Sequence, residues 1–167
     1  WPFKAYHIYI FTRTYRHPLL RYIPMNVSQK CQYALRALLE LAQRGDSQPV
    51  PSTAIAESRS IPVRFLETIL NELKQAGWVR SRRGVRGGYV LSVGLESLSV
   101  GDVVRLIDGP LMPRNLQPSK GTDGTPNVFH AVWVQAHDAI AEVLDAATFD
   151  QLLAQEQGHA TTPVFSI

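Results

Sequence analysis

Cysteine is almost absent from this chain of 167 residues, in which Cys31 is the only one. A single cysteine excludes an intramolecular disulfide and any metal site built from several thiolates of one chain. Such scarcity is typical of the reducing cytosol, so we expect a cytoplasmic protein. Cys31 falls on the apolar side of a predicted helix, where a small buried thiol is the expectation and a reactive sensor the alternative.

Long apolar runs are also missing, and none approaches the roughly 20 residues that span a bilayer. No membrane segment is therefore predicted. The hydrophobic content of 45% is nevertheless enough for one real core, or for one small domain with a dimerisation element. We find no grouping of nucleophile, base and orienting residue, so the sequence does not indicate an enzyme.

Acidic side chains are absent from residues 1–24, which are rich in aromatic and basic residues. The apolar stretch 8–11 is too short for the core of a secretory signal, and Arg13 and Arg16 follow it. Met25 stands directly before a clear helix start. We interpret residues 1–24 as a nonessential N-terminal extension, with a functional basic arm as the alternative.

Acidic residues are few in the stretch 52–91 as well, which holds seven Lys or Arg and three Glu, a net charge of +4. Residues 92–167 hold three basic and nine acidic side chains, a net charge of −6. The overall charge of +3 hides this polarity along the chain. A basic segment of this kind is the electrostatic footprint of a protein that binds the phosphate backbone of a nucleic acid.

The stretch 62–76 has apolar residues at helical spacing, which predicts an amphipathic helix. Its apolar side is formed by Phe65, Leu66, Ile69, Leu70, Leu73 and Ala76. Its polar side is formed by Arg64, Glu67, Thr68, Asn71 and Gln75. A helix that buries one side and presents hydrogen-bonding groups on the other is suited to a DNA major groove. The alternative is an ordinary surface helix.

A shorter helix capped by Ser52 or Thr53, a turn at 59–61 and a basic hairpin complete the pattern of a winged helix-turn-helix. The hairpin tip carries Arg82, Arg83 and Arg86 among glycines that allow close approach to another surface. Contact with phosphates or the minor groove is the functional interpretation, and a solvated basic loop is the alternative. Lys30, in the preceding helix, is included among the predicted DNA contacts.

Three further helices are predicted from periodicity and capping residues. The first begins at Asn26 or Ser28 and ends at Gly45, and another follows Ser99, with Asp102 in its first turn. The third, about 127–147, has one broad apolar face. Because so long an apolar face exceeds what a small domain can cover, it indicates pairing with a second copy of the chain.

Several motifs place the chain near a known family. They are Tyr33-Ala34-Leu35-Arg36-Ala37-Leu38, Ile55-Ala56-Glu57, Phe65-Leu66-Glu67, Leu73-Lys74-Gln75-Ala76-Gly77-Trp78-Val79 and Arg83-Gly84-Val85-Arg86-Gly87-Gly88-Tyr89. These motifs resemble those of the IscR, NsrR and CymR type of bacterial winged-helix transcription regulators, and the resemblance keeps its register over about residues 25–157. The resemblance implies that Arg64, Glu67 and Arg83 reach bases or the groove.

The segment 108–127 matches the sensor loop of relatives that hold an iron–sulfur cluster with three cysteines. This sequence has no cysteine there, and thiolates must supply most ligands of such a cluster, so we expect no cofactor. His130 matches a nitrogen-ligand position of some relatives, but one histidine cannot hold a cluster. A small-molecule or protein effector at 108–127 is one hypothesis, and a constitutive DNA binder with a disordered loop is the other.

The predicted fold is mainly α, a winged helix-turn-helix DNA-binding domain with a small β-hairpin wing and a long dimerisation helix. The predicted divisions are 1–24 extension, 25–107 DNA-binding domain, 108–127 sensor-type loop, 128–157 dimerisation helices and 158–167 flexible tail. The predicted function is a homodimeric transcription regulator, a repressor by resemblance, that binds a pseudo-palindromic site on double-stranded DNA through 62–76 and 82–88. The alternative is a winged-helix protein-interaction module, which has no general need of so basic and glycine-rich a tip.

Overall fold

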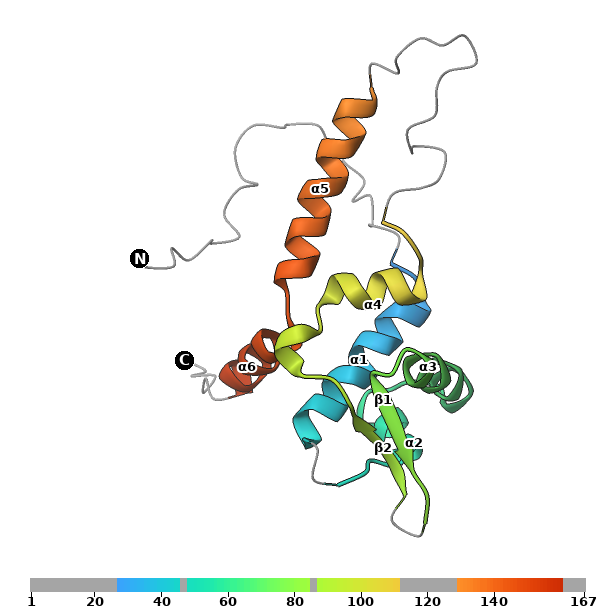
Figure 1. The fold of residues 1–167 in the computed structure, drawn as a ribbon. Coiled ribbons are helices and arrows are strands. Elements are labelled where there is room, and N and C mark those ends of the chain that lie inside the picture. The colour runs from blue at the N-terminus through green and yellow to red at the C-terminus, as the bar shows by residue number, and fades with distance from the viewer. Residues whose placement is uncertain (1–26, 46–47, 85–86, 112–128, 161–167) are drawn as a thin grey trace, which may run out of the picture.

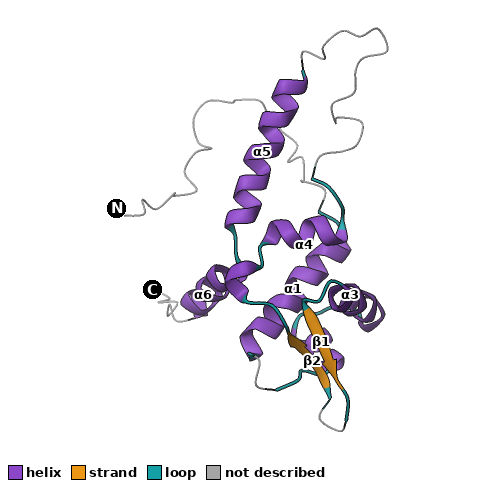
Figure 2. Cartoon of the chain, in the orientation of Figure 1, coloured by secondary structure: helices purple, strands orange, loops and turns teal. Residues whose placement is uncertain are grey.

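The computed structural model of the chain describes residues 27–45, 48–84, 87–111 and 129–160 (Figure 1). Six α-helices, one short 3-10 helix and a two-stranded antiparallel hairpin make up this part of the chain (Figure 2). Their bounds are α1 Gln29–Arg44, α2 Ser52–Ser58, α3 Val63–Gln75, β1 Val79–Arg82, β2 Gly88–Leu91, η1 Leu95–Ser97, α4 Val100–Ile107, α5 His130–Ala146 and α6 Phe149–Ala160. The predicted winged helix-turn-helix fold is confirmed, and residues 1–24 lie outside the described part.

Helix α1 forms the centre of the domain and begins and ends where the sequence predicts. The Ser28 side chain accepts a hydrogen bond from the Cys31 amide, and Gly45 ends the helix with a φ of 68°. Its inner face is fully buried against α3 and α4, and it consists of small and apolar side chains with one carboxylate: Cys31, Ala34, Ala37, Leu38, Glu40, Leu41 and Ala42. The burial of Glu40 was not apparent from the sequence.

Helices α2 and α3 form the helix-turn-helix. Pro51 occupies the position before α2 with no side-chain cap, so the prediction that Ser52 or Thr53 caps this helix is wrong. Ser60, in the turn that follows, has a φ of 51°, which lets the chain reverse before α3. Helix α3 begins after Pro62 and ends before Gly77, whose φ of 79° suits a glycine after a helix.

The hairpin pairs Val79 with Leu91 at its base and Arg82 with Gly88 near its tip. Residues 49–51 form an edge segment beside the hairpin through a single antiparallel bridge, in which Val50 and Tyr89 exchange amide-to-carbonyl hydrogen bonds of 2.9 and 2.8 Å. A side chain at Gly88 would collide with the Val50 carbonyl. A glycine at this position therefore allows the segment after α1 to close over the hairpin.

Helix α4 begins with a capping box, in which the Ser99 hydroxyl accepts from the Asp102 amide and the Asp102 carboxylate accepts from the Ser99 amide. This arrangement satisfies two amides at the helix start. Asp108 follows the last residue of the helix, and its carboxylate accepts hydrogen bonds from the Ser28 amide (2.8 Å) and hydroxyl (2.5 Å). The end of α4 is thereby fastened to the start of α1.

Helix α5 extends away from the other helices, whereas α6 returns to them (Figure 1). Phe149 at the start of α6 is 1% exposed and belongs to the same core as α1 and α3. Helix α6 also continues to Ala160, past the predicted start of the tail at residue 158. None of the helices described has both the length and the apolar character that a membrane-spanning segment requires.

A buried ion-pair network joins α1, the helix-turn-helix and α6. The Glu40 carboxylate is 2% exposed and accepts hydrogen bonds from Arg44, Ser58 and Arg59 at 2.8 to 3.0 Å. Arg59 also pairs with Glu156 of α6 at 2.8 Å. Burial raises the pKa of the Glu40 carboxyl, but the hydrogen bonds from Ser58, Arg59 and Arg44 outweigh it and hold the net pKa below its ordinary value.

Replacing Arg59 by Ala should lower the free energy of unfolding by about 3 kcal/mol at pH 7, because a buried carboxylate loses its main charged partner. Since the folded-state pKa of Glu40 is lowered, its contribution is present above the ordinary value of 4.5 and is lost as the pH falls through the folded-state value. Chemical denaturation from pH 7 to pH 3 should therefore show a smaller acid loss in Arg59→Ala than in the wild type.

The matched control is Arg36→Ala, because Arg36 is exposed on the same helix as Glu40 and forms no ion pair with the described residues. This variant should remain within about 0.5 kcal/mol of the wild type. Equal losses in the two variants would contradict a specific role for the network.

Candidate nucleic-acid interface

Helix α3 presents the predicted polar side chains to solvent. Leu66, Ile69, Leu70 and Leu73 are buried. The side chains predicted to contact DNA from this helix are all exposed: Arg64, Glu67, Thr68 and Asn71. The Thr68 hydroxyl donates to the Arg64 carbonyl at 3.3 Å, so its lone pairs remain available to accept a bond. The arrangement provides donors and acceptors of the kind that read base edges.

The hairpin lies directly after α3, and the Trp78 amide donates to the Leu73 carbonyl at 3.0 Å across the turn between them. Arg82 and Arg83 are exposed. Arg86 lies outside the described residues. A Cβ on Gly87 would come within 2.6 Å of the Arg82 carbonyl, so the hairpin tip requires a glycine there to stay this narrow.

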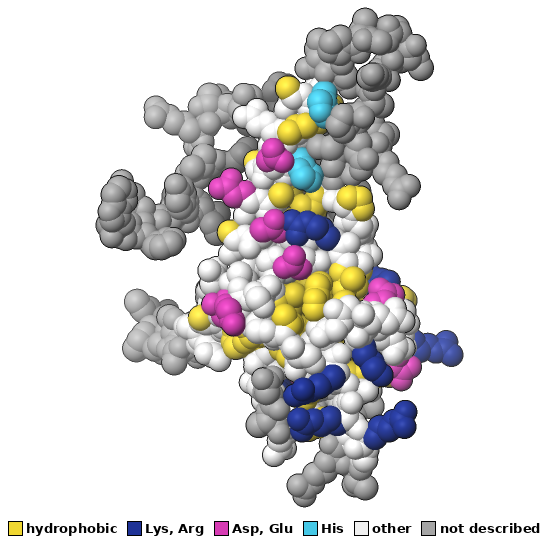
Figure 3. Space-filling view, viewed as in Figure 1, with side chains coloured by type: hydrophobic (Ala, Val, Ile, Leu, Met, Phe, Trp, Pro, Cys, Tyr) yellow, Lys and Arg dark blue, Asp and Glu magenta, His cyan; other side chains and the backbone are white. Residues whose placement is uncertain are grey.

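The exposed arginines of this face differ in their pairing from Arg59 and Arg105. Arg59 and Arg105 are held by carboxylates of Glu40, Glu156 and Asp145. By contrast, those of α3 and the hairpin form no ion pair within the described ranges: Arg64, Arg80, Arg82 and Arg83. Figure 3 shows Lys and Arg side chains gathered over the hairpin end of the molecule and acidic side chains mostly towards α4 and α5. Unpaired cations on one surface favour a polyanion.

Lys30, the remaining predicted DNA contact, is engaged within the protein. Its ammonium lies 2.7 Å from the Glu72 carboxylate, and both side chains are about one-third exposed, at 37% and 32%. This pair joins α1 to α3 on the flank of the recognition helix. The geometry supports a role for Lys30 in positioning α3, while its contact with DNA remains a prediction.

Two exposed residues of this face were not identified from the sequence. Phe65 was predicted to be buried, but it is 58% exposed, and that prediction is wrong. At 3.6 residues per turn, Phe65 lies about 100° around the helix from Leu66, at the margin of the apolar side. This angle could have predicted its exposure from the sequence. Arg80 was counted only in the charge balance, yet it is exposed on β1 beside the arginines of the tip.

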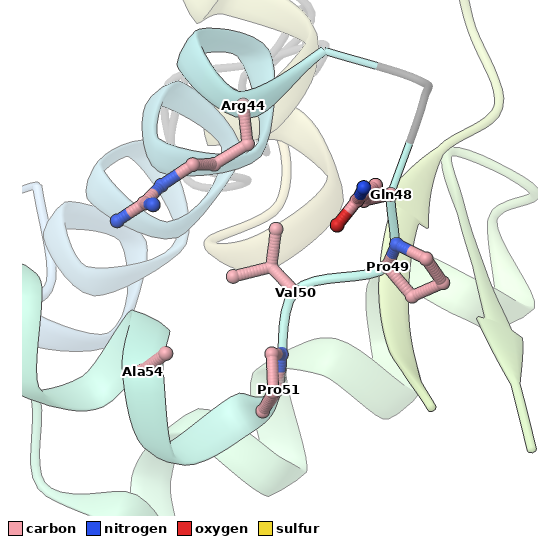
Figure 4. Close-up of a pocket in the computed structure, with 6 residues that line it drawn as sticks. All are labelled: Arg44, Gln48, Pro49, Val50, Pro51 and Ala54. Atoms are coloured by element: carbon pink, nitrogen blue, oxygen red, sulfur yellow. The ribbon is translucent and has the colours of Figure 1, made fainter. Parts of the chain in front are cut away.

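A shallow pocket of about 280 Å³ lies between α1, the edge segment and α2, lined by Arg44, Gln48, Pro49, Val50, Pro51 and Ala54 (Figure 4). Its charged side chain, Arg44, is paired with Glu40 at 3.0 Å and points away from Pro49 and Pro51 (Figure 4). The pocket therefore offers little to orient a ligand.

The described residues offer no set of thiolate ligands for an iron–sulfur cluster. Cys31 is fully buried, and burial together with the negative charge of Asp108 raises the pKa of its thiol to about 12. Such a thiol is a poor metal ligand, because the thiolate is the form that binds. His130 lies in the first turn of α5, and the described residues contain no group of three or more His, Cys, Asp or Glu that could hold a metal ion. Of the segment 108–127, only residues 108–111 are described.

Comparison with known proteins gives a consistent result. The family model "Rrf2: Iron-dependent Transcriptional regulator" matches residues 27–155. The chain is 31% identical to the HTH-type transcriptional regulator CymR of Bacillus subtilis over 147 residues, which cover 86% of this chain and 100% of that protein. It is 30% identical to the regulator IscR of Escherichia coli over 134 residues, covering 80% of this chain and 83% of that protein.

Solved structures agree with these sequence matches. The structure of CymR, described as the global cysteine regulator of B. subtilis, matches with a TM-score of 0.66 and 30% identity, over 77% of this chain and 96% of that one. That of T. potens IscR matches with a TM-score of 0.65 and 31% identity, over 82% and 91% of the two chains.

Proposed function

Since the chain belongs to the Rrf2 family of transcriptional regulators, we propose that it acts as a homodimer whose two recognition helices enter successive major grooves of a pseudo-palindromic operator. The chain is a DNA-binding transcription regulator. Where its operator overlaps a promoter, a dimer bound there excludes the polymerase and represses transcription.

The observation that carries this proposal is that α3 is buried on one side and exposed on the other. One side packs in the core, while Arg64, Glu67, Thr68 and Asn71 face solvent beside the unpaired arginines of the hairpin. A recognition helix needs hydrogen-bonding groups for bases and cations nearby for phosphates, and this surface supplies both. The predicted roles are base contacts for Arg64 and Glu67 and phosphate or groove contacts for Arg82, Arg83 and Arg86.

Variants of Arg82 and Arg64 should distinguish the loss of a phosphate contact from the loss of a base contact. Arg82→Ala should flatten the slope of log affinity against log salt by about 0.9, the contribution of one phosphate contact on duplex DNA. Arg64→Ala should cost on the order of 1 to 3 kcal/mol on the preferred site and little on random DNA. Fluorescence anisotropy titrations at several salt concentrations measure both effects.

The control for charge alone is Gln135→Glu, which shifts the net charge by one unit on exposed α5 and should leave the salt slope unchanged. An unchanged slope in Arg82→Ala would count against the wing assignment. Equal losses on specific and random DNA in Arg64→Ala would show that Arg64 contacts only phosphates.

The dimer proposal rests on α5. Leu144 packs against the core, and Asp145 pairs with Arg105 of α4 at 2.5 Å. Another side of the helix exposes a row of large apolar side chains, at 41 to 69% exposure: Phe129, Val132, Trp133, Ile140 and Val143. A contiguous apolar row of this length on one helix is suited to a self-complementary interface with a second copy.

Placing a charge in this row should prevent dimerisation. Val143 is 69% exposed, so Val143→Glu should leave the monomer folded but bury an unpaired carboxylate in the dimer. In sedimentation velocity experiments, Val143→Glu should sediment as a monomer, whereas the wild type should sediment as a dimer. Gln135→Glu adds the same charge to α5 outside the row, since Gln135 lies about 140° around the helix from Ile140 and about 80° from Val143. A dimer of Val143→Glu as stable as that of the control would contradict the interface.

We further propose that this protein regulates DNA binding without an iron–sulfur cluster, because its one thiol is buried in the core beside α3 and α4. Even two chains would supply only two cysteines, and thiolates must provide most cluster ligands. Protein purified without oxygen should contain no stoichiometric iron or sulfide and show no visible absorption band. A stoichiometric cluster whose removal changes operator binding would overturn this proposal.

A further inference from the structure

Phe65 is the exposed aromatic side chain of the recognition helix. It lies in the first turn of α3 and is 58% exposed, although the three leucines of the same helix and Ile69 are fully buried. Its ring rests on that of Tyr33 from α1, with centroids 6.2 Å apart and planes tilted by 53°. This contact restricts the ring on one side and leaves the remainder facing solvent.

The position of Phe65 in the helix indicates what it meets. In helix-turn-helix proteins, residues near the N-terminus of the recognition helix approach the base edges. Phe65 directly follows Arg64, an exposed arginine without an ion pair in the described ranges, and the hairpin supplies further unpaired arginines. The surroundings are therefore complementary to a polyanion, and an apolar protein partner would have to bury those cations as well.

Within the major groove, the feature that an aromatic ring can recognise is the C5-methyl group of thymine. The other groups at the base edges are hydrogen-bond donors or acceptors, which a phenyl ring cannot satisfy. We propose that Phe65 packs against the C5-methyl of one thymine in each operator half-site and selects thymine at that position. This inference rests on the proposed DNA-binding dimer and adds a specificity residue to it.

With the contact between Phe65 and the thymine methyl, the bases of the half-site would be recognised by two kinds of interaction. Arg64 and Glu67 would read hydrogen-bonding groups, whereas Phe65 would read a methyl group. Tyr33 acts as a positioning residue, because its ring limits the orientations of Phe65 before DNA binds.

The test uses the full chain and DNA that differs only in methyl groups. Duplexes enriched from a random pool by the wild-type protein are resynthesised with each symmetric pair of thymines replaced by uracil, which lacks the methyl group. At one pair, wild-type affinity should fall roughly 15-fold, about fourfold for each methyl removed from contact. Phe65→Ala should bind the thymine and uracil duplexes equally at that pair.

Gln75→Ala is the matched control, since Gln75 is exposed in the last turn of the same helix, and it should retain the full uracil penalty. Phe65→Gln, which keeps good helix propensity, provides a second variant should Phe65→Ala fold poorly, and it should also lose the penalty. Phe65→Tyr keeps the ring and should keep the penalty.

A uracil penalty that persists unchanged in Phe65→Ala would overturn the proposal, as would a wild type with no penalty at any thymine of an enriched symmetric site. Either result leaves the DNA-binding function intact. Failure of the wild type to enrich any sequence or bind any duplex would instead overturn the proposed function, and the thymine contact with it.

Discussion

The structure depends on the packing of α3 against the centre of the domain. Leu66, Ile69, Leu70 and Leu73 are fully buried there, and each such side chain contributes about 1.5 to 3 kcal/mol to folding. Because a helix has fixed angles between its side chains, burial of this side fixes Arg64 and Asn71 on the opposite one. The same packing that stabilises the domain thus determines which groups are available to a nucleic acid.

Ion pairs distinguish the part of the domain that holds the helices together from the surface proposed to contact DNA. Glu40 and Glu156 hold Arg59, which ties the helix-turn-helix to α1 and α6, and Asp145 holds Arg105 at the base of α5. Asp108 fastens the end of α4 to the first residues of α1. The arginines of α3 and the hairpin lack such partners within the described ranges, so no ion pair there competes with phosphates for them.

Local signals in the sequence predicted the elements, but not all of the packing. Ser28, Gly45, Gly77 and Ser99 mark helix ends because caps and left-handed glycines are needed wherever a helix stops, whatever surrounds it. The exposure of Phe65 follows from its position at the margin of the apolar side, whereas the burial of Glu40 depends on Arg59, a neighbour distant in sequence that periodicity does not reveal. The return of α6 to the core has the same origin, since Phe149 fills a site formed by residues much earlier in the chain.

The most direct test of the account is a hydroxyl-radical footprint of the wild-type protein on DNA enriched by that protein. A dimer with two recognition helices predicts two symmetric protected segments, whose centres lie about 10 base pairs or a multiple of this apart, together with protection of the backbone beside each half-site. A single protected segment with no symmetric counterpart, or no protection at all, would contradict the claim that two copies of α3 read one operator.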